Sequence, residues 1–235
     1  MPMAMERYSV IDWKKPREIV LLRGKGCVYK KCAFCDYHID SCPDQEENDK
    51  LNASVLARVT GRFGELEVIN SGSVFELSEN TRRNIRCVCA EKGIDTIHFE
   101  SHYLYRDAIP ALRQEFDGFT LKMKLGLETF DEEFRENVLH KGIPERDGGE
   151  ISRGFQEVNL LFGLTGQTEE TMRRDMELAL RYFERVCVNI MCANSTPIRP
   201  DEQVTEAFKE KILPVFADDP RVDILLHNTD FGVGD

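Results

Sequence analysis

The sequence contains no apolar run long enough to cross a membrane. Stretches such as Ile19–Leu22 are far shorter than the roughly 20 apolar residues of a membrane-spanning helix. The opening segment, MPMAMERYSV, also lacks the basic and then apolar order of a secretory signal. We therefore expect a cytoplasmic protein without a membrane partner. Because 235 residues suffice for one sizeable core, we expect a single domain over residues 1–235, with its core at about 18–226.

Basic residues are also scarce, since 31 Lys and Arg stand against 42 Asp and Glu and give a net charge of −11. The basic groups are short, as in Lys14–Arg17, and none forms a stripe interleaved with aromatic residues. Long nucleic acids are held mainly by Lys and Arg contacts to phosphate, so an acidic protein repels them. The composition therefore favours a small-molecule substrate, and we expect no stable nucleic-acid partner.

Cysteine is not scarce, because the chain has eight. In a reducing compartment, clustered cysteines point to metal binding or catalysis more often than to disulfides. Cys87 and Cys89 are one residue apart in a predicted helix, so their side chains diverge. Cys187 and Cys192 flank a predicted buried strand, where cysteine packs as a small hydrophobic side chain. We expect these four cysteines to be structural and predict no second metal centre.

Apolar, β-rich runs alternate with helical stretches along nearly the whole chain. The predicted strands are Glu18–Arg23, Leu66–Asn70, Thr96–Glu100, Thr120–Leu127, Glu157–Phe162, Val186–Met191 and Val222–Leu226. The predicted helices are Ala53–Phe63, Glu79–Lys92, Glu132–His140, Glu169–Glu184 and Asp201–Val215. Ser78 and Thr168 each precede an acidic first turn, which is typical of a helix N-cap. The polar runs Pro43–Lys50 and Glu145–Glu150 are predicted as loops.

This alternation predicts the α/β class, with parallel strands joined by right-handed crossovers. Six or seven units are too few for a closed eightfold barrel of about 250 residues. We therefore expect a partial (β/α)6-type TIM barrel with a short C-terminal extension, and a doubly wound sheet is the main alternative. In both folds, functional groups gather at the carboxyl ends of the strands.

Three cysteines lie close together after the first predicted strand, in the segment CVYKKCAFC that carries Cys27, Cys32 and Cys35. Three thiolates at this spacing can hold three corners of a [4Fe–4S] cluster and leave one iron without a protein ligand. A structural zinc site is the alternative, because His38 or Cys42 could supply a fourth tetrahedral ligand.

Further motifs follow this segment in a definite order. Asn70-Ser71-Gly72-Ser73 comes after the second predicted strand, Glu128 ends the fourth, and the fifth runs into Gly163-Leu164-Thr165. With the Phe34-Cys35 ending of the cysteine segment, this order resembles the radical S-adenosylmethionine (SAM) superfamily. One departure is the gap of four residues between the first two cysteines, where the commonest signature of the superfamily has three.

The resemblance implies a radical SAM domain with a [4Fe–4S] cluster on Cys27, Cys32 and Cys35. It implies reductive cleavage of SAM to a 5′-deoxyadenosyl radical, with electrons from an external donor of the flavodoxin or ferredoxin type. It also implies a SAM site formed by Phe34, Ser71, Gly72, Ser73, Glu128, Gly163 and Thr165.

Within the superfamily, the chain is most similar to the queuosine lyase group of bacterial queuine salvage. The similarity lies in the four-residue gap, the sequence Cys35-Asp36-Tyr37-His38, the small size and the lack of a second cluster. It implies release of the base queuine from queuosine or its 5′-monophosphate, after abstraction of a ribose hydrogen. Two alternatives are a radical SAM enzyme that modifies another nucleoside or a tRNA base, and a zinc-stabilised binding module without catalysis.

Queuine carries a protonated amine and a diol, for which carboxylates and other polar side chains are suitable partners. Such side chains occur beside the cysteine segment and at predicted strand ends, and His102 and Tyr105 could instead cover the barrel mouth. The predicted substrate residues are Tyr37, His38, Glu100, His102, Asn194, Asn228 and Asp230. The sequence assigns no catalytic acid or base.

Overall fold

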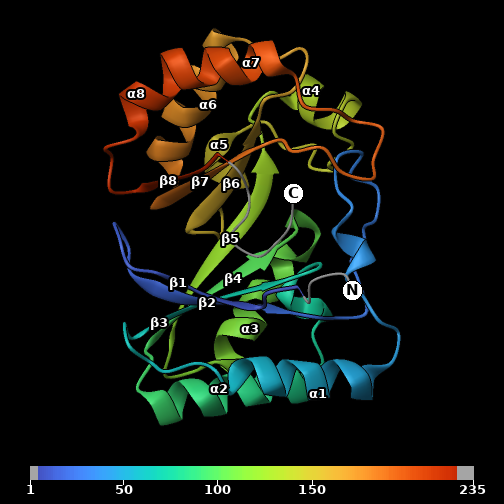
Figure 1. Ribbon diagram of the computed structural model, residues 1–235, viewed down its shortest axis with the longest axis vertical. Helices are drawn as coiled ribbons and strands as arrows, with labels where there is room; N and C mark the ends of the chain where they lie inside the picture. The colour runs from blue at the N-terminus through green and yellow to red at the C-terminus, as the bar shows by residue number, and fades with distance from the viewer. Residues whose placement is uncertain (1–4, 227–235) are drawn as a thin grey trace. The chain divides into compact units, whose positions relative to one another are not determined.

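The computed structural model describes residues 5–226, which divide into two compact units (Figure 1). The first unit comprises residues 5–30 and 37–123, and the second comprises residues 31–36 and 124–226. Each unit is described by itself below, and the expectation of a single domain stays a prediction. Within residues 5–226, no helix combines the length and the apolar character that a membrane span requires.

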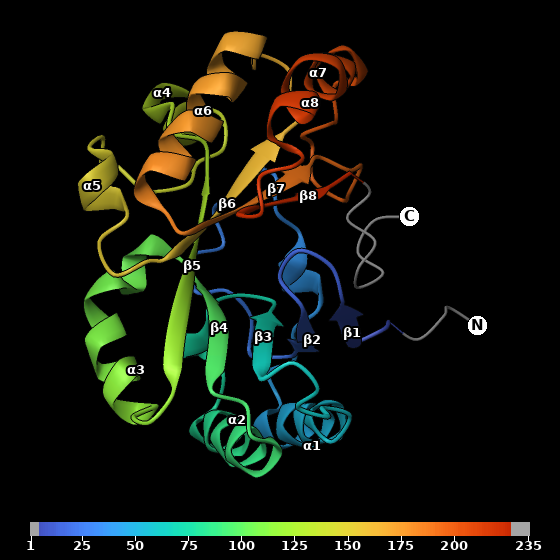
Figure 2. The same cartoon turned by 90° about the vertical axis from the view of Figure 1, so that its left-hand side faces the viewer.

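The first unit is built on a sheet with helices packed against it. Its strands are β1 (Tyr8–Ile11), β2 (Arg17–Leu22), β3 (Glu65–Asn70) and β4 (Thr96–Ser101). Its helices are α1 (Gln45–Leu56), α2 (Glu79–Lys92) and α3 (Ile109–Glu115), with short 3-10 helices η1 (Tyr37–Ile39), η2 (Val74–Glu76) and η3 (Tyr103–Ala108). The strands β2, β3 and β4 are parallel, whereas β1 pairs antiparallel to β2. Helices α1 and α2 lie side by side beneath these strands (Figure 1, Figure 2).

The second unit continues the alternation of strand and helix. Its strands are β5 (Thr120–Glu128), which starts in the first unit, β6 (Glu157–Phe162), β7 (Arg185–Ile190) and β8 (Val222–Leu225). Its helices are α4 (Glu132–Asn137), α5 (Gly148–Ile151), α6 (Glu169–Tyr182), α7 (Glu202–Ala207), the π-helical η4 (Phe208–Ile212) and α8 (Leu213–Phe216). The strands β5 to β8 are parallel, and α6, α7 and α8 cover one face of them (Figure 2).

Strand order in the sheet follows chain order from β1 to β8. A doubly wound sheet reverses its strand order at a switch point, so this order excludes that alternative. The α/β class and the partial (β/α) barrel are confirmed. The predicted N-caps are confirmed too, since the Ser78 and Thr168 side chains accept hydrogen bonds from the backbone of Thr81 and Thr171.

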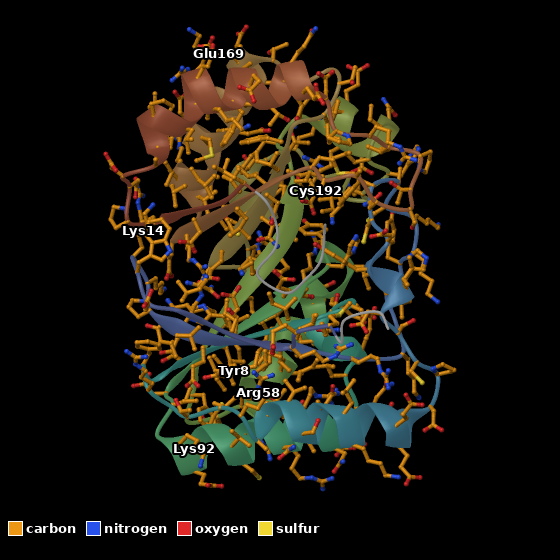
Figure 3. The ribbon with its side chains drawn as sticks, in the orientation of Figure 1. Tyr8, Lys14, Arg58, Lys92, Glu169 and Cys192 are labelled. Carbon is orange, nitrogen blue, oxygen red and sulfur yellow. The ribbon has the colours of Figure 1, made fainter. Side chains whose placement is uncertain are left out.

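Strand β1 was not predicted, because four residues at a sheet edge give a weak pattern. Its Tyr8 donates a hydrogen bond of 2.7 Å to the buried Glu18 on β2, and burial together with this contact raises the pKa of Tyr8 to about 12. Arg58 lies over the Tyr8 ring, 4.9 Å from its centroid. Figure 3 labels the two side chains. These contacts hold the edge strand to the first unit.

The prediction of a loop over Pro43–Lys50 is wrong, because α1 begins at Gln45. The Asp44 side chain caps it by accepting from the backbone of Glu47, and acidic residues of the first turn suit the positive end of the helix dipole. The helix also ends at Leu56 rather than Phe63. Within the predicted loop Glu145–Glu150, Asp147 likewise caps the short helix α5.

The predicted helix Asp201–Val215 is divided into α7, η4 and α8. Pro214 lies at the start of α8, and its ring leaves no backbone N–H for the regular hydrogen-bond ladder. The ladder therefore changes to a π-helical turn before the proline.

Buried ion pairs join the strands on the side where the parallel strands begin. In the first unit, Arg17 on β2 pairs with Glu67 on β3. In the second unit, Arg185 on β7 pairs with Glu157 on β6, at 3.2 Å, and with Asp223 on β8. These groups are structural, which leaves the carboxyl ends of the strands for function.

Candidate functional site

The cysteine segment follows β2, and the boundary between the two units falls inside it. Cys27 belongs to the first unit, and Cys32 and Cys35 belong to the second. All three are partly exposed, and within residues 5–226 none of them forms a disulfide, which is compatible with thiolate ligation of a cluster. Among residues 5–226, no three His, Cys, Asp or Glu side chains are arranged as a metal site, so the ligand assignment rests on spacing and relatives.

The glycine-containing segment lies at the carboxyl end of β3 in the first unit. Asn70 donates its amide to the backbone oxygen of Ser73, at 3.1 Å. The other polar atom of the Asn70 amide, Oδ1, and the hydroxyl of Ser71 are buried, and the described residues offer neither a hydrogen-bond partner. A buried polar atom without a partner costs about 1–3 kcal/mol. These two atoms therefore fit a ligand that carries amino or hydroxyl groups, such as the amino-acid end of SAM.

Gly72 gives this segment room to approach the cysteine segment. A Cβ at this position would lie 3.2 Å from the Cα of Cys27 and 1.8 Å from Oε2 of Glu76. Glu76 and the backbone of Cys27, the first predicted cluster ligand, thus already fill the space that a side chain at position 72 would need.

His102 lies next to the same segment. Its backbone N–H donates to the Ser73 hydroxyl at 2.9 Å, and its ring stacks on Tyr29 with 4.4 Å between centroids. The Nδ1 atom accepts from the backbone of Leu104 at 3.1 Å, which assigns the ring proton of the neutral imidazole to Nε2. The structure thus places one predicted substrate residue beside one predicted SAM residue.

The other substrate residues predicted for the first unit lie on different elements. Tyr37, which is exposed, and His38 are on η1, and Glu100 is on β4. Asn228 and Asp230 lie outside the described residues. The substrate role of all these residues stays a prediction.

The second unit holds a buried ion pair at the end of β5. The Lys141 ammonium donates to Oε1 of Glu128 at 2.9 Å, and the two side chains are only 8% and 9% exposed. Lys141 also lies 5.4 Å from the ring centroid of Phe34, within reach of a cation–π interaction. Burial alone lowers the pKa of Lys141, but the negative charge of Glu128, and after it that of Cys32 and Cys35 as thiolates, raises it above its ordinary value. The ammonium therefore stays charged beside the cysteine segment.

The backbone around Glu128 is shaped to present its carboxylate. The strand register shifts between Gly126 and Glu128, and Glu128 itself has a φ of 74°. A left-handed conformation at a residue other than glycine costs about 1 kcal/mol or more and persists only where contacts hold it. One such contact is made by Asp175, which accepts a hydrogen bond of 2.8 Å from the backbone N–H of Phe130, two residues after Glu128.

Two loops of the second unit hold the Cys32–Cys35 half of the cysteine segment. Asn194 donates its amide to the backbone oxygen of Phe34 at 2.7 Å, and its Oδ1 accepts from both the backbone and the hydroxyl of Thr196. The Ala33 backbone donates to the oxygen of Leu139 at 2.9 Å. The structure thus places Asn194, a predicted substrate residue, against the cysteine segment, with its amide engaged by the protein.

The segment after β6 turns at Gly163, whose φ is +87°. A Cβ there would lie 2.8 Å from the Thr205 hydroxyl, so glycine suits both the conformation and the packing. Thr165, exposed on the same turn, donates to Asp201 at 2.8 Å. This places the two predicted SAM residues of the turn beside the start of α7.

Sequence reasoning did not predict Tyr29 or Glu76 as site residues. Glu76 had a usable signal, because Ser73 and Glu76 have the spacing of a capping box.

Comparisons with known proteins show what the whole chain is similar to. No protein-family model matches the chain. The queuine lyase from Clostridium spiroforme, solved with SAM and queuine bound, is 45% identical with a TM-score of 0.94, over 99% of this chain and 100% of that one. The chain belongs to the queuine lyase family of radical SAM enzymes.

Membership in the queuine lyase family confirms the predicted enzyme class and its cofactors, SAM and a [4Fe–4S] cluster. It excludes the zinc-stabilised module without catalysis. SuiB from Streptococcus suis, bound to SAM, is 13% identical with a TM-score of 0.57 over 88% of this chain and 49% of that one, and shows the fold alone. An uncharacterized protein of Methanocaldococcus jannaschii is 27% identical over 142 residues, which are 53% of this chain and 38% of that protein.

Proposed function

We propose that this protein releases queuine from queuosine or its 5′-monophosphate in a SAM-dependent radical reaction. The observation that carries the proposal is the full-length similarity to a queuine lyase, at 45% identity and a TM-score of 0.94. When SAM and the cluster are bound, they supply a radical that abstracts hydrogen from the ribose.

The predicted site residues have separate tasks in this proposal. Cys27, Cys32 and Cys35 hold the cluster. The segment Asn70–Ser73 receives the amino-acid end of SAM, and its two buried polar atoms without a partner support this role. The buried pair of Glu128 and Lys141 provides a fixed carboxylate and a fixed ammonium for the polar groups of SAM.

We assign recognition of the substrate to polar side chains beside the cysteine segment and at the predicted strand ends. A cationic base is best met by carboxylates, and a diol by groups that accept and donate hydrogen bonds. We assign this role to Tyr37, His38, Glu100, His102, Asn194, Asn228 and Asp230. His102 is the best supported of them within the described residues, because it adjoins Ser73.

The remaining partners follow from the chemistry and the charge. An external donor of the flavodoxin or ferredoxin type supplies the electron, since the chain shows one cysteine motif for one cluster. The net charge of −11 supports a nucleoside rather than a nucleic acid as substrate. We place the reaction in the cytoplasm, where such donors and a reducing environment are available.

Anaerobic reconstitution with iron and sulfide, followed by incubation with dithionite, SAM and queuosine, tests the proposal. We expect 5′-deoxyadenosine and free queuine by mass analysis. Guanosine serves as the matched control, because it has the ribose without the cyclopentene diol and the amine of queuine. Formation of 5′-deoxyadenosine without queuine would exclude queuosine as the substrate, and comparison with the 5′-monophosphate would identify the preferred form.

A further inference from the structure

Glu76 is the last residue of η2, just after the glycine-containing segment in the first unit, and it contacts three parts of the site. Its Oε1 accepts from the backbone N–H of Val28 at 2.7 Å and from the Tyr105 hydroxyl at 3.1 Å. Its Oε2 accepts from the backbone N–H of Ser73 at 2.7 Å. Val28 follows Cys27 directly, so one carboxylate joins the first cysteine to the segment at the end of β3.

We infer that Glu76 is a positioning residue that fixes the Cys27 end of the cysteine segment relative to the Asn70–Ser73 segment. The inference rests on the proposed function, which places the cluster on Cys27 and SAM on Asn70–Ser73. Through these contacts, Glu76 sets how well the two segments hold their ligands together, although it need not touch either ligand.

Only a carboxylate can make the backbone contacts on both sides. Each of its two oxygens faces a backbone N–H, and a backbone N–H can only donate. Glutamine at position 76 would have one oxygen and one NH₂ group. The NH₂ group would therefore face either Val28 or Ser73 with donor against donor, and one of these contacts would be lost.

Gly72 completes the arrangement by leaving space for this carboxylate. A Cβ at position 72 would lie 1.8 Å from Oε2 of Glu76. The backbone of Gly72 does not have the left-handed φ that favours glycine, so the need for glycine here is steric. Any side chain at this position would displace Glu76 from Ser73.

Tyr105 supports the carboxylate from η3. Its ring stacks on Phe75 at 4.9 Å between centroids, which fixes the hydroxyl toward Glu76. Removal of this hydroxyl leaves both backbone contacts of Glu76 in place. A Tyr105→Phe variant should therefore have a smaller effect of the same kind as a Glu76→Gln variant.

Titration of SAM into the reduced, reconstituted enzyme tests the inference, with the SAM-dependent change in the electron paramagnetic resonance spectrum of the cluster as readout. Hydrogen bonds to charged groups contribute about 1.5–3 kcal/mol, so we expect Glu76→Gln to raise the SAM dissociation constant roughly tenfold or more. Tyr105→Phe should raise it about two- to tenfold. Glu79→Gln is the matched control, because Glu79 is exposed at the start of α2, and it should leave the constant unchanged.

Iron content per chain and the unfolding temperature of the cluster-free protein separate positioning from folding. We expect Glu76→Gln to unfold at nearly the wild-type temperature yet to bind SAM weakly per cluster. A wild-type dissociation constant in Glu76→Gln would overturn the inference. If that variant does not fold, an unchanged constant in Tyr105→Phe would overturn it instead. A wild-type protein that takes up no cluster would overturn the proposed function itself, and the inference with it.

Discussion

Replacement of Lys141 by methionine should lower the free energy of unfolding by about 3–5 kcal/mol. Lys141 and Glu128 form an ion pair at 2.9 Å, with side chains 8% and 9% exposed. Methionine keeps most of the volume of lysine but removes the charge, and Glu128 is then left as a buried carboxylate without its cation. Since about 1.4 kcal/mol corresponds to a factor of ten, the loss equals a change of roughly 150-fold or more in the unfolding equilibrium.

The double variant Glu128→Gln with Lys141→Met separates the ion pair from side-chain packing. The double variant removes both charges, and replacing a whole buried pair is often close to neutral. Its free energy of unfolding should therefore decrease less than that of Lys141→Met alone. Lys209→Met is the control, because Lys209 pairs with Glu206 on an exposed helix face, where such pairs contribute well under about 1 kcal/mol.

Urea unfolding of the cluster-free protein, under reducing and anaerobic conditions, measures these differences from the midpoint and slope. A loss below about 1 kcal/mol for Lys141→Met would refute the reasoning. The reasoning would also be refuted if the double variant lost as much stability as the Lys141→Met and Glu128→Gln single variants together, because the two residues would then not be coupled.

Three further predictions concern other residues of the site. Cys32→Ala should abolish SAM cleavage, measured as 5′-deoxyadenosine formation. Cys87→Ala, at an exposed position of α2, should leave cleavage intact. Cleavage by the Cys32 variant would contradict the ligand assignment. Gly72→Ala should impair SAM binding as strongly as loss of the Glu76 contact to Ser73, because its Cβ would lie 1.8 Å from Oε2 of that residue; a wild-type SAM dissociation constant would argue against a steric role. Burial raises the pKa of Asp175 from 3.8 to about 6, so its ionisation costs roughly 3 kcal/mol and stability should fall as the pH rises from about 4 to 6. Urea unfolding at several pH values should show that Asp175→Asn abolishes this decrease in the free energy of unfolding. An unchanged pH dependence in the variant would show that Asp175 does not cause the decrease.

The elements with strong local signals could be predicted from the sequence. Strand β6 has the predicted bounds Glu157–Phe162, because it is a short apolar run that the fold buries. Helix α2 has the predicted bounds Glu79–Lys92, since Ser78 caps its start and Gly93 adopts the left-handed conformation after its end. Helix α1 could not be placed from its apolar pattern, because its first turns are almost wholly polar and only the Asp44 cap marks where it begins.

In the candidate site, too, only the parts with a local sequence signal could be predicted. The cysteine segment and the segment at Asn70–Ser73 could be predicted, because each has its chemistry in consecutive residues. The contacts that Glu76 and Lys141 make could not be predicted, because they form only in the folded chain. Val28, for example, lies 48 residues from Glu76 in the sequence.

In the proposed function, a radical reaction on the ribose releases the base. The most direct test is to incubate the reconstituted enzyme with SAM and with queuosine whose ribose carbons all carry deuterium. We expect the 5′-deoxyadenosine formed with queuine to carry one deuterium from the substrate. Queuine release accompanied by unlabelled 5′-deoxyadenosine would contradict this expectation, because the hydrogen would then have come from elsewhere.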